Sequence, residues 1–125
     1  MMTQRLIAQL RAQRQSWVEL EPGKQVQIMR PAETDIGGLL RAEGGAGRSL
    51  QVGLPEVSRF VTGWQGITEA DLLGPTVGAS DLVPFDAALW AEVVADRADW
   101  LGTVAAALLA AVVKHFEAKE AAEKN

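Results

Sequence analysis

The fold is decided by the stretch of residues 96–116, which reads DRADWLGTVAAALLAAVVKHF. Asp96 is a good N-terminal cap for a helix, and Asp99 adds negative charge to the first turn, where the helix dipole favours it. Apolar residues then recur at gaps of three or four, which is the spacing of one helix face. The pattern predicts a helix whose apolar face consists of Leu101, Val104, Ala105, Leu108, Leu109, Val112, Val113 and Phe116.

The opposite face of that helix is uncharged. Small residues occupy it, and no charged residue stands between Asp99 and Lys114. A helix that is apolar all round is usually buried, so this one is either the central helix of the domain or a contact surface for a second copy or a partner helix. In the second interpretation Ala107 and Ala111 are the candidate contact residues. The whole face consists of Thr103, Ala106, Ala107, Ala110 and Ala111.

Another helix is predicted just before it. Asp86 is a suitable N-terminal cap, and Phe85 can pack on Trp90 as a hydrophobic staple. We therefore expect residues 85–125 to form a C-terminal pair of helices with a polar tail.

The N-terminal part of the chain changes its period. Residues 1–15 predict a short polar helix with a narrow apolar edge. Residues 16–30 alternate apolar and polar side chains on either side of Pro22-Gly23, a pair that suits a turn. This part therefore predicts a lean helix followed by a β-hairpin.

The middle of the chain, residues 31–64, predicts two helices separated by a glycine-rich loop at 43–49. The second of these helices begins near Pro55 and is closed by Gly66. Residues 65–84 form a long connection, of a length that is uncommon unless the segment binds something or is tied down. The helical spacing of the second helix is carried by Val57, Phe60, Val61 and Trp64.

Together these segments predict a single domain over residues 1–125. Its expected class is mainly α (α+β), with about four to five helices and one small N-terminal β-hairpin.

The side chains available for chemistry are few. The chain has no cysteine, which excludes disulfides and thiolate metal sites. Its one histidine is His115, which leaves little scope for a zinc site built from histidines. The glycine-rich loop lacks the phosphate-loop pattern, because Ala42 and Arg48 replace the glycine and lysine that it needs. We predict that the protein is not an enzyme and has no catalytic residue, cofactor or metal site.

Charge and hydropathy limit the partners. Residues 1–50 hold seven Lys/Arg against five Asp/Glu, whereas residues 51–125 hold five against eleven, so the net charge is −4. An acidic half argues against nucleic acid as a partner. The longest apolar stretch, residues 100–113, is shorter than the roughly 20 residues that cross a bilayer. We therefore expect no membrane partner and a cytoplasmic location.

Several segments resemble those of a known family. Residues 63–73, GWQGITEADLL, are similar to the tryptophan–x–glycine–valine segment of bacteriophage or prophage tail assembly chaperones. Val83-Pro84-Phe85-Asp86 resembles the proline–phenylalanine–cap element that follows it in that family. Residues 26–31 resemble a strand that ends in Arg-Pro before an acidic helix. The glycine-rich loop and the first 15 residues depart from the family pattern.

The resemblance implies a role in assembly. Members of this family bind the tape measure protein of a long-tailed phage, keep it soluble and help recruit tail-tube subunits. The tape measure and tail-tube proteins are therefore the expected partners, with a second copy of the chain as a further candidate. The candidate partner contacts are Trp64, Ile67, Leu72 and Leu73 along the long connection, together with Ala107 and Ala111.

Two other functions remain open at this stage. One is a structural component of the tail, such as a terminator or connector. The other is a bacterial adaptor or regulatory module that binds a protein unrelated to phage.

Overall fold

The structure is a computed structural model, and it describes residues 1–42 and 48–124. These residues form six helices and five strands. The helices are α1 (Met2–Ala12), α2 (Glu33–Leu39), α3 (Leu54–Arg59), α4 (Glu69–Leu73), α5 (Ala87–Ala95) and α6 (Ala98–Lys124). The strands are β1 (Gln15–Glu21), β2 (Lys24–Met29), β3 (Leu40–Ala42), β4 (Arg48–Leu50) and β5 (Val61–Gln65).

The main sheet has three antiparallel strands in the order β1-β2-β5. The predicted hairpin over 16–30 is present as β1 and β2, and Gly23 takes the positive φ of 82° that its turn requires. β5, however, comes from residues 61–65 and adds a third strand beside β2. The predicted mainly α domain of four to five helices with a single N-terminal hairpin is therefore wrong, and the fold combines six helices with a three-stranded sheet.

A β-bulge explains why β5 resembles a helix in the sequence. Val61 and Trp64 both face the core although they are three residues apart, which is a helical spacing. In a regular strand they would point to opposite faces. The register of β5 against β2 shifts between Gln27 and Ile28, and the extra residue brings both side chains to the same face.

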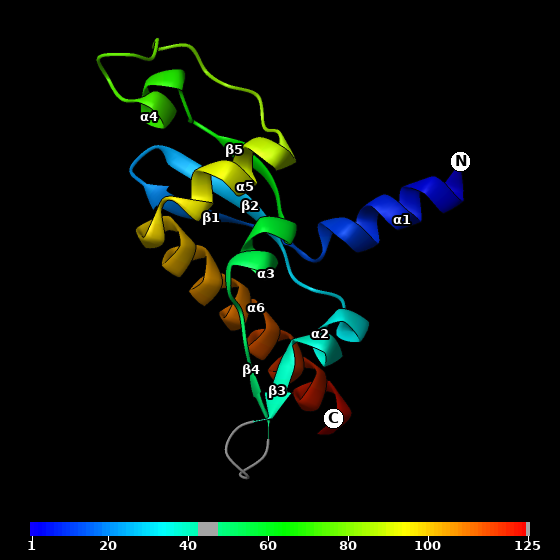
Figure 1. Cartoon of the computed structure of the whole chain (residues 1–125). Coiled ribbons are helices and arrows are strands. Elements are labelled where there is room, and N and C mark those ends of the chain that lie inside the picture. Colours follow the sequence, from blue (N-terminus) through cyan, green and yellow to red (C-terminus); the bar gives the residue numbers. More distant parts are fainter. Residues whose placement is uncertain (43–47, 125) are drawn as a thin grey trace.

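The core lies between one face of this sheet and three helices. α6 packs against α3, α5, β1 and β2, and it runs along the body of the molecule (Figure 1). Trp90 and Trp100 are fully buried, and their indole nitrogens donate hydrogen bonds to the Val57 carbonyl oxygen and to Glu21 Oε2, each at 3.0 Å. The centre of the core consists of Val26, Ile28, Val57, Phe60, Val61, Trp64, Ile67, Trp90, Val94, Trp100, Val104 and Leu108.

Residues 31–50 also differ from the prediction. The helix expected to run to residue 42 ends at Leu39, and the chain continues into β3, which pairs antiparallel with β4. Arg48 and Ser49, expected in the glycine-rich loop, belong to β4. The remainder of that loop, residues 43–47, lies outside the described residues.

The long connection over 65–84 is tied down along its length. It contains α4, which is capped by Thr68: the Thr68 hydroxyl accepts a hydrogen bond from the Asp71 amide, and Asp71 accepts one from the Thr68 amide. Backbone hydrogen bonds join Glu69 to Asp81 and Ala70 to Ala79. The segment is therefore a folded part of the domain.

α1 projects away from the rest of the molecule (Figure 1). None of its residues is buried. Its apolar edge of Leu6, Ile7 and Leu10 is exposed to solvent.

Candidate protein-binding surfaces

The outward side of α6 carries a stripe of apolar residues. The helix is buried at every fourth position, at Trp100, Val104, Leu108 and Val112. On its other side one row of exposed residues has gaps of four, three, four and three, which is the spacing of a coiled-coil seam. We call this surface the α6 stripe; it consists of Gly102, Ala106, Leu109, Val113 and Phe116.

Three large side chains of the α6 stripe were expected in the core. Leu109, Val113 and Phe116 are instead 38%, 47% and 40% exposed. The helix is apolar on several sides, so the spacing alone does not show which side the sheet and the other helices cover. Complete burial of such a side chain is worth about 1.5–3 kcal/mol, so covering the exposed part of each would contribute about 1 kcal/mol.

The two alanines that the sequence singles out lie beside the stripe. Ala107 is half-buried and packs against the core. Ala111 is half-buried and lines an open crevice between α1 and α6. Ala106 and Ala110, which directly precede Ala107 and Ala111 in the sequence, are exposed. The structure therefore moves the candidate contact surface by about 100° around the helix axis, the angle between successive residues.

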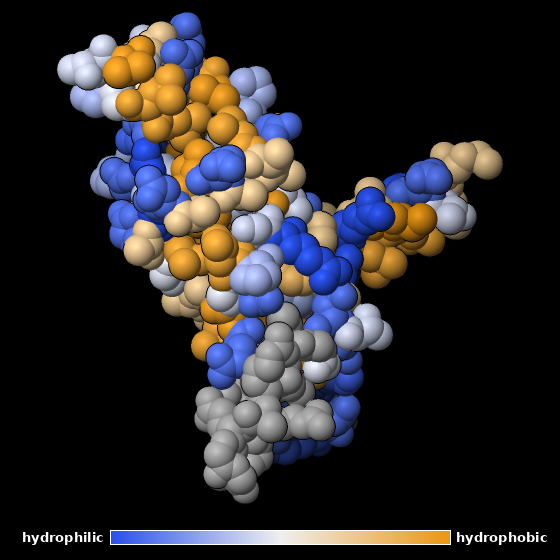
Figure 2. Space-filling model, in the orientation of Figure 1, coloured by the Kyte–Doolittle hydropathy of each residue, from blue (hydrophilic) through white to orange (hydrophobic). Residues whose placement is uncertain are grey.

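A second apolar surface joins α4 to α5. Leu72 and Leu73, both predicted as partner contacts, line a shallow groove of about 250 Å³ together with Leu89 and Val93 of α5. Leu73 is 57% exposed. Figure 2 shows the hydrophobic surface that gathers over α4 and α5. The charged residues that line the groove are Glu92, Asp96 and Arg97.

The other two candidates from the long connection lie in the core. Trp64 and Ile67 are 8% and 1% exposed. The indole nitrogen of Trp64 donates a 2.7 Å hydrogen bond to the Val83 carbonyl oxygen, and its ring meets Phe85 edge-on with centroids 5.4 Å apart. These contacts hold the two ends of the connection together. Trp64 and Ile67 thereby position Leu72 and Leu73, which are the accessible members of the group.

An ion-pair cluster joins α2 to the C-terminal half of α6. Glu33 accepts hydrogen bonds from Lys119 Nζ at 2.9 Å, and its other oxygen lies 2.6 Å from His115 Nε2. The hydrogen bond from His115 and then that from Lys119 lower the pKa of Glu33 to about 2. The cluster fixes α2 on one side of α6 and leaves the α6 stripe on another.

Metal ligands and membrane contact are separate questions. In residues 1–42 and 48–124, no group of three or more His, Cys, Asp or Glu side chains is placed to hold a metal ion. α6 is long and apolar enough to cross a membrane by length and composition alone, and 17% of its most apolar stretch is buried in the fold. Because long core helices of soluble proteins meet the same criterion, the length and composition of α6 are weak evidence for a membrane span. The expected cytoplasmic location stays a prediction.

Comparison with models of known protein families, with curated proteins and with solved structures found no match. The resemblance to tail assembly chaperones therefore stays a prediction that depends on the segments of this sequence.

Proposed function

We propose that the protein is an assembly chaperone of the kind found in phage tail assembly, and that it holds an apolar helix of its client along the α6 stripe. The client expected from the sequence resemblance is the tape measure protein, with tail-tube subunits as further partners. The α6 stripe is the observation that carries the proposal.

The geometry of the α6 stripe supports a helical client. It runs from Gly102 to Phe116, a rise of about 21 Å at 1.5 Å per residue, which is the length of about four helical turns. Gly102 and Ala106 at one end are small, so the backbone of a partner helix can approach closely there. Leu109, Val113 and Phe116 at the other end supply the apolar area. This arrangement is typical of a surface that binds one face of an amphipathic helix.

The charges around the α6 stripe support specificity for an apolar segment. No charged residue interrupts residues 100–113, and Asp99 and Lys114 mark the two ends of this uncharged region. A client that carries charges in the middle of its contact face would leave them unpaired against the stripe, which is costly. The α4–α5 groove offers a second apolar contact for the same client.

The proposal is tested by co-expression with the tape measure protein whose gene we expect beside that of this chain. The wild-type chain is expected to keep the client in the soluble fraction and to co-purify with it. Leu109→Glu places a charge in the centre of the α6 stripe and is expected to abolish both. Leu82→Glu is the matched control, because Leu82 is 70% exposed and lies outside the stripe.

Retention of the client by Leu109→Glu at the wild-type level would overturn the proposal. A loss shared by Leu109→Glu and Leu82→Glu would overturn it as well, since the effect would then not be specific to the stripe. Light scattering of the purified chain distinguishes a client surface from a self-association surface. A stable dimer that Leu109→Glu dissociates would assign the stripe to a second copy instead.

A further inference from the structure

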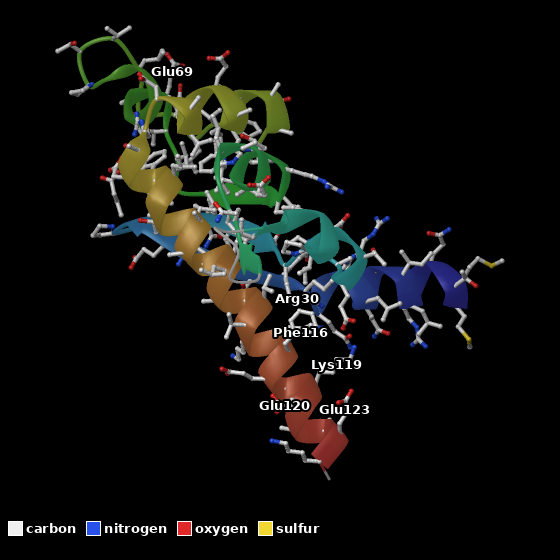
Figure 3. All side chains as sticks on the ribbon, turned by 60° about the horizontal axis from the view of Figure 1, so that its bottom comes forward. Arg30, Glu69, Phe116, Lys119, Glu120 and Glu123 are labelled. Carbon is white, nitrogen blue, oxygen red and sulfur yellow. The ribbon has the colours of Figure 1, made fainter. Side chains whose placement is uncertain are left out.

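A basic crevice lies on another side of α6, at the end of α1. This α1–α6 crevice has a volume of about 770 Å³ and is open to solvent. Three cationic residues, Arg14, Arg30 and Lys114, line it together with His115, and no Asp or Glu among the described residues lines it. Figure 3 shows α1 and the C-terminal half of α6 diverging from the neighbourhood of Arg30. The crevice is therefore a concentration of positive charge on a chain whose net charge is −4.

The backbone brings two of these cations together. The Arg30 amide donates a 2.7 Å hydrogen bond to the Arg14 carbonyl oxygen, which ties the end of β2 to the end of α1. Partial burial and the neighbouring Arg14 guanidinium lower the pKa of Arg30, against the opposing effect of Glu33. Two guanidinium groups are thus held close to each other by the fold.

Glu33, which contacts the lining residue His115, is already engaged. Glu33 pairs with His115 and Lys119 at 2.6 and 2.9 Å. Within the described part of the chain, Arg14 and Lys114 form no ion pair with any carboxylate. The crevice therefore has positive charge that the protein itself does not neutralise.

The shape and lining of the crevice indicate the class of ligand. Its volume far exceeds that of one phosphate group, and among residues 1–42 and 48–124 no Phe, Tyr or Trp lines it to stack on a base. Leu10, Ala111 and Ala118 give it aliphatic walls between the cations. A chain of carboxylates joined by short aliphatic segments matches this pattern better than a compact anion or a nucleotide.

We propose that the α1–α6 crevice binds an acidic segment of a partner protein, whose carboxylates pair with Arg14, Arg30 and Lys114. Charge-assisted hydrogen bonds of guanidinium to carboxylate are short, directional and stronger than neutral ones. The site is separate from the α6 stripe, because residues 111 and 113 lie about 200° apart around the helix axis. One chain could therefore hold an apolar helix and an acidic segment at the same time.

The test uses a fluorescein-labelled peptide of six Glu-Ala-Ala repeats and measures its fluorescence anisotropy with the whole chain at low salt. We expect saturable binding that weakens as salt is raised. The double variant Arg14→Glu/Lys114→Glu is expected to weaken binding by about tenfold or more. The matched control Arg5→Glu/Lys124→Glu changes the net charge equally but lies outside the crevice, and it is expected to change the affinity by less than about twofold.

Equal weakening by both double variants would overturn the proposal, because binding would then follow net charge alone. Displacement of the peptide by inorganic phosphate at similar concentration, or tighter binding of an oligo-dT strand than of the peptide, would overturn it in favour of a phosphate ligand. If the reversed charges unfold the chain, Arg14→Gln/Lys114→Gln takes their place with the same expectation. Leu109→Ala is expected to leave peptide binding intact, which separates this site from the proposed client surface.

Discussion

Val112 and Val113 are neighbours in the sequence, but the side chain of Val112 is buried in the core and that of Val113 is exposed to solvent. Val112 is 3% exposed and belongs to the buried row of α6, whereas Val113 is 47% exposed and belongs to the α6 stripe. Two identical side chains in one helix therefore have different environments. The difference defines which side of the helix is free to bind.

A pair of substitutions measures this difference directly. Val112→Glu buries an unpaired carboxylate and is expected to lower the free energy of unfolding by about 3 kcal/mol or more. Val113→Glu places the same group in water and is expected to change it by less than about 0.5 kcal/mol. Urea denaturation followed by circular dichroism gives both values. Equal destabilisation by the two variants would show that the stripe is covered in the isolated chain.

Glu33 is expected to give a pH-dependent contribution to stability. Its pKa is lowered to about 2 in the folded protein, below the ordinary carboxyl value near 4.5, so its stabilising effect is present above that ordinary value. The effect should be lost as the pH falls from about 4.5 towards 2. We expect Glu33→Gln to have a lower melting temperature than wild type at pH 6, with the gap closing by pH 2.5.

The control for Glu33 is Glu117→Gln, an exposed carboxylate of α6 that forms none of the described ion pairs. Its melting temperature should follow that of wild type across the same range. A gap between wild type and Glu33→Gln that stays constant down to pH 2.5 would contradict the ion-pair cluster.

Trp64→Phe tests how the long connection is held. The variant keeps an aromatic ring but removes the donor to the Val83 carbonyl oxygen. Leaving that partly buried group unpaired is expected to cost about 1–3 kcal/mol, seen in urea denaturation, and to speed amide exchange in residues 66–83. Trp17→Phe is the matched control, because Trp17 is 46% exposed, and we expect less than about 0.5 kcal/mol. A neutral Trp64→Phe would be incompatible with a tied-down connection.

Gly78 and Gly37 should respond to alanine in opposite directions. A Cβ atom at Gly78 would lie 2.5 Å from the Glu69 carbonyl oxygen and 2.6 Å from backbone atoms of Ala70, so Gly78→Ala is expected to destabilise by about 1–3 kcal/mol. Gly37 lies in α2 with nothing within 4 Å of an added Cβ, so Gly37→Ala should stabilise by about 0.5–1 kcal/mol. Thermal unfolding of the two variants compares them, and the same sign for both would contradict this packing.

Local signals in the sequence were sufficient for some elements. Alternation around Pro22-Gly23 found the hairpin, and Asp86 marked the start of α5, where it accepts a hydrogen bond from the Leu89 amide. The capping box of Thr68 and Asp71 is a local signal of the same kind, but α4 was not predicted, because residues 65–84 were taken together as a connection. These features depend on residues close together in the chain, which is why a single sequence can reveal them.

Non-local contacts decided the rest. β5 was missed because a bulge gives Val61 and Trp64 a helical spacing, and only the pairing with β2 shows that they lie in a strand. The α6 stripe was missed because Leu109, Val113 and Phe116 are as apolar as the buried residues of α6. Only the packing of the sheet and the other helices on α6 shows which of its apolar side chains are buried. Arg14 and Lys114 come from opposite ends of the chain, so the α1–α6 crevice has no sequence signature.

The central claim is that the client lies on the α6 stripe, and site-specific photo-crosslinking tests it most directly. A benzophenone amino acid replaces Phe116 of the stripe in one variant and Trp17, an exposed aromatic residue of the sheet, in another. After co-expression with the tape measure protein and irradiation, we expect a crosslinked species from position 116 and none from position 17. Crosslinking from position 17 with none from position 116 would contradict the claim.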